Sequence, residues 1–86
     1  MMKARKMFEK LGYEYLHYIR DDGIEEEFIE YSKTRYKIEY VIEFNLLTKQ
    51  IEFINGKRLT GSWHTIELKE LQAINKQVEE LGWNIK

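Results

Sequence analysis

The sequence predicts an α+β fold: an antiparallel β-meander of about four strands, with an N-terminal and a C-terminal helix packed on one face, in the order α-β-β-β-β-α. Apolar residues recur at helical spacing near both ends of the chain and alternate with polar residues through the middle, and short turn-forming segments separate the alternating stretches. A chain of 86 residues has room for one hydrophobic core. We therefore expect a single α+β domain over residues 1–86.

The two predicted helices end with the same signal. The first, Met2–Leu11, carries an apolar stripe formed by Ala4, Met7, Phe8 and Leu11. The last carries a stripe formed by Leu71, Ile74, Val78 and Leu81. A glycine follows each stripe, at Gly12 and Gly82, and an aromatic residue follows each glycine. This order favours a left-handed residue that ends the helix. Glu67 and Glu70 have the spacing of a capping box at the start of the last helix.

Strand periodicity occupies the middle of the chain. The predicted strands are Tyr13–Arg20, Glu26–Ser32, Tyr36–Phe44 and Gln50–Ile54, with a weaker extended piece at Arg58–Thr60. Because side chains alternate, one face of the sheet is more apolar than the other, and we expect both helices to cover it. This face carries Tyr13, Ile29, Ile38, Ile42 and Phe53.

Three turns predict the strand register. A three-residue loop at Asp21–Gly23 pairs Tyr15 with Ile29. A two-residue loop at Lys33–Thr34 pairs Ile29 with Ile38, and it also pairs Glu30 with Lys37. A four-residue loop at Leu46–Lys49 pairs Phe44 with Ile51. In all three hairpins apolar residues then oppose apolar residues on one face.

Composition excludes several classes of function. The chain holds 14 Lys and Arg and 15 Asp and Glu, so it lacks a general basic field and nucleic-acid binding is disfavoured. It has no cysteine, which excludes disulfides, thiolate catalysis and cysteine-ligated zinc and favours the cytoplasm. No apolar run approaches the roughly 20 residues of a transmembrane helix, so no membrane role is expected.

No nucleotide-binding, metalloprotease or hydrolase motif is present, so no catalytic residue, metal or cofactor is assigned. The predicted register does place three polar groups side by side at the limit of the apolar face: His17, Glu27 and Tyr40. An imidazole, a carboxylate and a phenol together could transfer a proton or bind a small polar ligand. The favoured interpretation is a mutually hydrogen-bonded cluster where the helix cover ends.

The second face of the sheet is the main candidate for function. It should present a contiguous and partly exposed apolar patch formed by Leu16, Tyr18, Phe28, Val41 and Ile54, among Glu26, Lys37, Glu39 and Glu52. An apolar patch ringed by charges is typical of an interaction surface. The alternative is that these are ordinary surface hydrophobic residues.

Two further segments carry weaker signals. Lys57, Arg58 and Trp63 surround a glycine-containing loop, where an aromatic ring and cations could contact bases and phosphates. The alternative is that Trp63 packs under the last helix. Residues 21–30 carry six acidic side chains, which could dock a basic partner. We favour a solvated hairpin whose charges pair across strands, as Glu30 would with Lys37.

The segments MFEKLGYEY, at Met7–Tyr15, and LQAINKQVEELGW, at Leu71–Trp83, resemble small proteins encoded by phages and prophages of Gram-positive bacteria. That family has a similar opening helix, a tyrosine-rich set of strands and a closing helix that ends in the same way. The resemblance covers both ends of the chain and, loosely, the middle. It implies a cytoplasmic location in a bacterial host, and it carries no functional residues to transfer.

The sequence does not by itself identify an activity. The leading hypothesis is a non-enzymatic protein-interaction module that binds a protein partner, or another copy of itself, through the second face of the sheet. The alternatives are a weak nucleic-acid binder that uses Lys57, Arg58 and Trp63, and an enzyme or small-molecule binder centred on His17, Glu27 and Tyr40.

Overall fold

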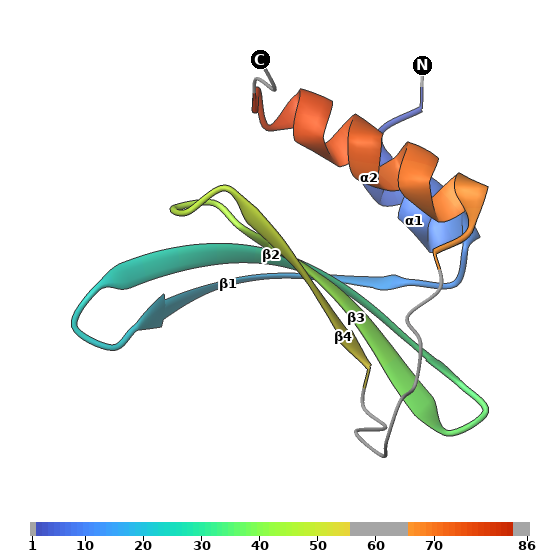
Figure 1. Ribbon diagram of the computed structural model, residues 1–86, viewed down its shortest axis with the longest axis horizontal. Helices are drawn as coiled ribbons and strands as arrows, with labels where there is room; N and C mark the ends of the chain where they lie inside the picture. Colours follow the sequence, from blue (N-terminus) through green and yellow to red (C-terminus); the bar gives the residue numbers. More distant parts are fainter. Residues whose placement is uncertain (1, 56–65, 84–86) are drawn as a thin grey trace.

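The structure, a computed structural model, describes residues 2–55 and 66–83 of the chain. Within those ranges the elements follow the predicted order: α1 (Ala4–Lys10), β1 (Glu14–Asp21), β2 (Glu25–Arg35), β3 (Ile38–Asn45), β4 (Gln50–Asn55) and α2 (Leu68–Glu80). The four strands form one antiparallel sheet in the order β1-β2-β3-β4, and both helices lie over the same face of it (Figure 1). The predicted α+β meander is confirmed. The extended piece predicted at Arg58–Thr60 lies outside the described residues.

Both helices end in the predicted way. The Tyr13 amide donates to the Phe8 carbonyl at 3.1 Å, and the Trp83 amide donates to the Val78 carbonyl at 3.1 Å. The glycine between helix and aromatic residue is left-handed in each case, with φ of 92° at Gly12 and 71° at Gly82. Each bond closes a Schellman motif around its glycine, so carbonyl groups of the last helical turn are satisfied.

The two helices are also tied to each other at their ends. The capping box predicted at the start of α2 is present, and the Glu67 amide donates to Glu70 Oε1 at 2.9 Å. Helix α1 has no side-chain cap of its own. Instead, the Ala4 amide donates to Glu80 Oε2 in the last turn of α2, at 2.7 Å. The beginning of α1 therefore lies against the end of α2, and a carboxylate near the α1 N-terminus also complements the helix dipole.

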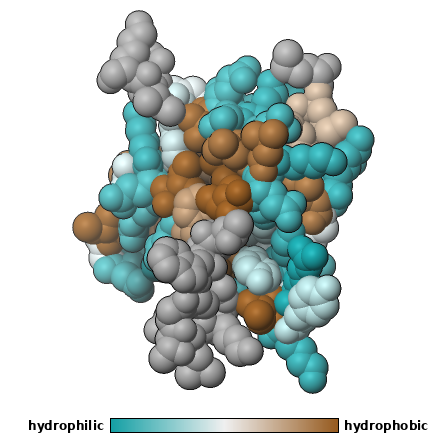
Figure 2. Space-filling model, turned by 45° about the vertical axis from the view of Figure 1, so that its right-hand side comes forward, coloured by the Kyte–Doolittle hydropathy of each residue, from teal (hydrophilic) through white to brown (hydrophobic). Residues whose placement is uncertain are grey.

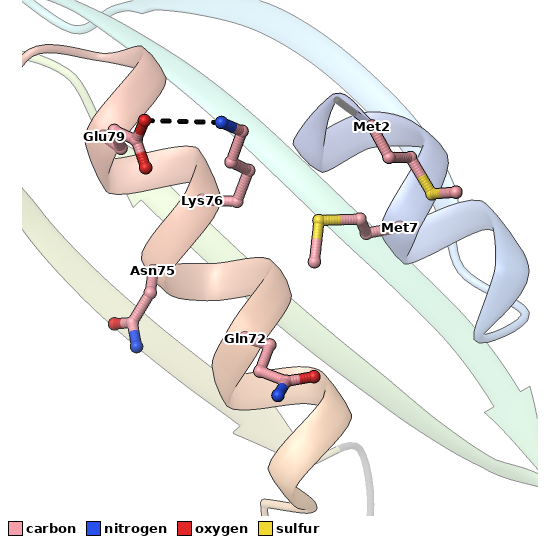
Figure 3. A pocket seen from close by; sticks show the side chains of 6 residues that line it. All are labelled: Met2, Met7, Gln72, Asn75, Lys76 and Glu79. Carbon is pink, nitrogen blue, oxygen red and sulfur yellow. Dashed lines mark hydrogen bonds and ion pairs between the residues drawn. The ribbon is translucent and has the colours of Figure 1, made fainter.

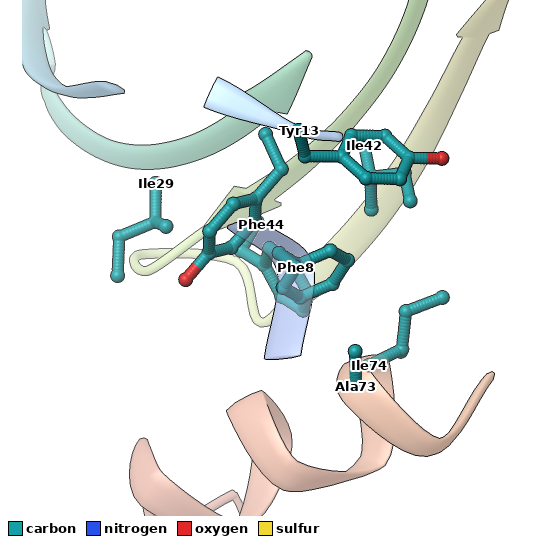
Figure 4. Packing of buried hydrophobic residues seen from close by; sticks show 8 residues of the cluster. Phe8, Tyr13, Ile29, Ile42, Phe44, Ala73 and Ile74 are labelled. Carbon is teal, nitrogen blue, oxygen red and sulfur yellow. The ribbon is translucent and has the colours of Figure 1, made fainter. Parts of the chain in front are cut away.

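The core forms where the two helices meet β2 and β3 (Figure 4). Phe8 of α1 stacks on Tyr31 with ring centroids 3.9 Å apart and 17° between the ring planes. The Tyr13 and Phe44 rings are nearly perpendicular to the Phe8 ring, with interplanar angles of 83° and 77°. The remaining buried members are Ile29, Ile42, Ala73 and Ile74. The helices therefore cover the face of the sheet that was predicted to be the more apolar.

The register of the first hairpin differs from the prediction by two residues. Tyr15 lies opposite Tyr31, and not opposite Ile29, because the strands close at the Asp21–Glu25 pair and the loop is Asp22–Ile24. Gly23 is left-handed, as expected, but it stands in the middle of this loop. A shift of two residues leaves every side chain on its predicted face, since side chains alternate with a period of two.

The second hairpin differs more. The predicted turn at Lys33–Thr34 is wrong: β2 and β3 remain paired as far as Arg35 and Ile38, and Tyr36 and Lys37 form the turn. Both turn residues have positive φ, 53° and 62°. Such a turn twists in the same sense as the strands, although side chains make this conformation unfavourable.

The longer pairing places Ile29 opposite Phe44 and Tyr31 opposite Ile42, at the centre of the core. The predicted pairs Ile29–Ile38 and Glu30–Lys37 do not form. The third hairpin has the predicted register, with Phe44 opposite Ile51.

Replacing Gly12 or Gly82 with alanine should lower the free energy of unfolding by about 1 kcal/mol or more at each position, because an L-residue is strained at positive φ. A Cβ atom built at either glycine meets no atom within 4 Å, so the cost is conformational and not steric. Asparagine tolerates the left-handed region and should cost less than alanine at the same position. Equal losses for alanine and asparagine in urea unfolding would contradict this explanation.

Candidate functional site

The structure brings together two of the three residues of the predicted polar cluster. His17 Nε2 lies 2.5 Å from Glu27 Oε2, and both side chains are open to solvent. They are diagonal neighbours, since His17 lies opposite Ile29 and Ile19 lies opposite Glu27. The pair stands on the β1–β2 hairpin, which extends away from both helices (Figure 1).

Tyr40 does not join this pair. It lies opposite Lys33, whereas His17 lies opposite Ile29, four residues away along β2. That separation is about 13 Å along a strand. The predicted cluster depended on the turn at Lys33–Thr34, and the longer hairpin moves Tyr40 to the other end of the sheet. The predicted three-residue pocket is therefore wrong, and an exposed His–Glu pair is left.

A buried polar group lies instead between α2 and the sheet. The Tyr13 hydroxyl donates a hydrogen bond to Glu70 Oε2, and the Glu70 side chain is buried. Lys33 Nζ lies 3.7 Å from the same carboxylate oxygen and 4.5 Å from the centroid of the Tyr13 ring. Burial, followed by the bond to Glu70, raises the pKa of Tyr13 well above its ordinary value. The capping box had already singled out Glu70, but nothing in the sequence connects it with Lys33.

A second buried contact joins α2 to β2. The Tyr31 hydroxyl donates to Gln77 Oε1 at 2.5 Å, and both side chains are buried. Among the described residues no buried side-chain nitrogen or oxygen lacks a hydrogen-bond partner. The buried Glu70 and Gln77 side chains therefore hold α2 to the rest of the fold, and their role is structural.

The face of the sheet turned away from the helices, here called the outer face, carries the predicted interaction residues. Leu16 is 50% exposed, and Tyr18 and Ile54 are half-buried. Phe28 and Val41, however, are only 3% and 7% exposed. The prediction of five partly exposed residues is therefore wrong for these two.

Side chains of the neighbouring strand β1 cover Phe28. The Tyr18 ring, directly opposite on β1, stacks on it with centroids 5.0 Å apart. The Arg20 guanidinium lies 4.8 Å from the centroid of the Phe28 ring. Long side chains on a strongly twisted sheet can thus cover an aromatic ring without a helix.

A row of glutamates crosses the outer face. Glu30 lies directly opposite Glu43, and Glu43 lies directly opposite Glu52. The alternation of the strands adds three more glutamates to this face, Glu14, Glu26 and Glu39. In the described strands, Arg20 is the only cationic side chain placed on it. Lys37, expected here as a partner for Glu30, lies in the β2–β3 turn.

The burial and charge of this row raise the pKa values of Glu30 and Tyr18. Burial, then the charges of Glu43 and Glu39, raise the pKa of Glu30 above its ordinary value of 4.5. Glu43 is 8% exposed and accepts a hydrogen bond from the Tyr18 hydroxyl at 2.6 Å. Burial and that bond raise the pKa of Tyr18 to about 12. The outer face thus combines partly exposed apolar side chains with glutamates that lie directly opposite one another on adjacent strands.

The surface around the two helices has fewer groups that could bind a ligand or catalyse a reaction. A groove of 510 Å³ lies between α1 and α2, lined by Met2, Met7, Gln72, Asn75, Lys76 and Glu79 (Figure 3). Lys76 and Glu79 form an ion pair with each other across 3.3 Å. Near the start of α2, Leu68 and Leu71 are exposed. Figure 2 shows hydrophobic residues gathered in the middle of one face of the molecule, with hydrophilic residues around them.

Lys57, Arg58 and Trp63 lie outside the described residues, so nucleic-acid binding through them stays a prediction. Within residues 2–55 and 66–83 no group of three or more His, Cys, Asp or Glu side chains could hold a metal ion. In the same ranges no helix is long and apolar enough to cross a membrane.

Comparison of the chain with models of protein families, with curated proteins and with solved structures gives no match.

Replacing Tyr13 with phenylalanine should lower the free energy of unfolding by about 1–3 kcal/mol, because the buried Glu70 carboxylate loses a donor. Tyr15→Phe is the matched control: its ring also packs against the core, and none of the hydrogen bonds found among the described side chains uses its hydroxyl. Urea unfolding of both variants measures the difference. Equal effects would show that the Tyr13–Glu70 bond contributes nothing.

Replacing Glu30 with glutamine should stabilise the protein at pH 7, and the gain should shrink as the pH falls towards 4.5. A carboxyl group whose pKa is raised by folding binds its proton more readily in the folded state, so the wild type recovers stability as this group is protonated. Glu14→Gln is the control on the same face, because Glu14 lies opposite Ser32. Thermal unfolding across this pH range tests the effect, and a gain for Glu30→Gln that stays constant with pH would contradict it.

Proposed function

We propose that this protein is a non-enzymatic protein-interaction module that binds a basic protein partner through the outer face of its sheet. The observation that carries the proposal is the row formed by Glu30, Glu43 and Glu52, directly opposed on adjacent strands. Like charges in direct cross-strand pairs oppose folding. A partner that brings cations to this row would relieve the repulsion between the glutamates. The relief would add to the free energy of binding.

The chemistry of the face also specifies the partner. Leu16 and the half-buried Tyr18 and Ile54 provide apolar contact, and the glutamates require cations beside it. A segment in which Lys or Arg alternates with apolar residues meets both requirements. Nucleic acid is a poor fit, because phosphates would meet carboxylates. A second copy stacked on this face is also a poor fit, because two glutamate rows would meet.

An enzymatic function receives less support. Catalysis by His17 and Glu27 would need a shielded site and further polar groups around a substrate. The pair is open to solvent, and Tyr40 lies at the other end of the sheet. The absence of cysteine supports a cytoplasmic location, and the resemblance of both helix ends to phage-encoded proteins supports a bacterial host.

A peptide of alternating lysine and leucine is a suitable probe of the outer face. In an NMR titration it should shift the amide signals of residues around Glu30 and Glu43, and salt should weaken its binding because the contact is electrostatic. A peptide of alternating glutamate and leucine has the same apolar content and should not bind. Equal binding of the two peptides, or shifts confined to α1 and α2, would contradict the proposal.

A pair of charge reversals separates this face from the rest of the molecule. The double variant Glu39→Lys with Glu52→Lys alters two exposed side chains of the outer face and should weaken the basic peptide at least about tenfold. The control, Glu25→Lys with Glu79→Lys, changes the net charge equally at exposed positions elsewhere. Equal weakening by both double variants would show that net charge, and not the outer face, attracts the peptide.

A further inference from the structure

The strand β1 is an open edge of the sheet. In the order β1-β2-β3-β4 it has a partner on one side only, among the described residues. Its pairing with β2 continues from Glu14 to Asp21 without a bulge. The sequence has no proline, and Leu16 and Ile19 on this strand are 50% and 56% exposed. Prolines, bulges and very short strands are among the devices that protect such edges, together with charged side chains, which β1 has at Glu14, Arg20 and Asp21. The edge has no proline and no bulge and is eight residues long, so it can accept another strand whose charges match its own.

The direction of the free backbone groups on β1 follows from one hydrogen bond. The Leu46 amide donates to the Glu27 carbonyl at 2.8 Å, so the backbone of Glu27 points towards β3. Backbone groups alternate in direction along an antiparallel strand, so those of Phe28 and Glu30 point towards β1. Phe28 lies opposite Tyr18, and Glu30 lies opposite Leu16.

Tyr18 and Leu16 therefore bond to β2. The residues between and beside them, Tyr15, His17 and Ile19, must direct their N–H and C=O groups away from the sheet. These three residues define the pairs that a further antiparallel strand would form at this edge.

We propose that β1 pairs with β1 of a second copy of this chain, antiparallel and with His17 on the two-fold axis. Tyr15 then forms a hydrogen-bonded pair with the partner's Ile19. Leu16 lies opposite the partner's Tyr18 on the outer face. Glu14 lies opposite the partner's Arg20, so each end of the new interface carries a pair of opposite charges. Aromatic–aliphatic and opposite-charge pairs are the cross-strand combinations that stabilise sheets.

This axis is the one that the sequence of β1 favours. An axis at Leu16 would place Glu14 opposite the partner's Tyr18, and an axis at Tyr18 would place Leu16 opposite the partner's Arg20. Both lose the charge pair. The strand β4, which has one neighbour among the described strands, is shorter. The same operation about Phe53 would place Glu52 opposite the partner's Ile54. The match between the two halves of β1 therefore indicates a second copy as the occupant of this edge.

The dimer forms through backbone groups at the edge of β1 and does not rest on the proposed function, although Leu16 and Tyr18 lie beside both surfaces. In the dimer the two sheets become one, and the outer faces of both chains lie on the same side of it. The two rows of glutamates then lie on one continuous surface, separated by the two β1 strands. Such a dimer presents its partner-binding face twice, so a partner with two basic segments would bind with avidity.

Sedimentation equilibrium of the full chain tests the dimer. The variant His17→Pro removes one outward N–H group and leaves the bonds between β1 and β2, because proline is tolerated on the free side of an edge strand. The wild type should dimerise with rising concentration, and His17→Pro should be monomeric with unchanged binding of the lysine–leucine peptide. Conversely, Glu39→Lys with Glu52→Lys should lose the peptide and keep the dimer. A wild type that is monomeric at millimolar concentration, or a dimer that survives His17→Pro unchanged, overturns the inference.

A charge swap tests the register and stands even if His17→Pro fails to fold. Glu14→Arg and Arg20→Glu each place like charges at both ends of the interface, so each variant alone should dimerise roughly tenfold more weakly than the wild type. Mixed in equal amounts, the two variants restore opposite charges at both ends and should form a heterodimer of about wild-type affinity. A mixture that associates no better than the separate variants overturns the proposed axis.

Discussion

The packing of both helices on the sheet depends on the contacts made by Tyr31. Its ring stacks on Phe8 of α1, its hydroxyl bonds to Gln77 of α2, and the ring meets Phe44 of β3 edge-on. One residue in the middle of β2 thus holds both helices and the neighbouring strand. Its position also explains why the second hairpin must be long: only the pairing that reaches Arg35 and Ile38 brings Tyr31 opposite Ile42, beneath the helices. The strained turn at Tyr36 and Lys37 accompanies that alignment.

Because the helices gather on the Tyr31 side, the other side of the sheet must satisfy its apolar residues without them. Phe28 does so through Tyr18 and Arg20, which belong to the adjacent strand. The same absence of cover allows glutamates to stand opposite one another in partial contact with water. The two faces of the sheet are therefore different kinds of surface: one is a packed core, and the other is a thin apolar layer with unbalanced negative charge. The second kind is suited to binding, and it supports the function proposed for the protein.

Sequence periodicity predicts the helices, the strands and the face on which each strand residue lies. It does not predict which residues pair across neighbouring strands. Alternation assigns a residue to a face irrespective of its partner, so shifts by an even number of positions left Ile29 and Tyr31 under the helices. The turn at Tyr36 and Lys37 has no glycine or asparagine, and nothing local distinguishes it from a strand.

The predicted cluster of His17, Glu27 and Tyr40 is wrong because the register of the second hairpin was not predictable. Tyr40 could join the other two residues only in the shorter hairpin. The burial of Phe28 and the approach of Lys33 to Glu70 are contacts between distant segments, which local patterns do not encode.

The hydrogen bond between the Ala4 amide and Glu80 spans 76 positions of sequence. Helix α1 has only seven residues and no side-chain cap, so it is too short to persist alone in water. Its stability comes from the sheet, whose core is completed by α2 at the other end of the chain. We therefore expect the first helix to become stable only when the last helix has also packed on the sheet. The Ala4–Glu80 hydrogen bond thus makes the stability of the first helix depend on the last one.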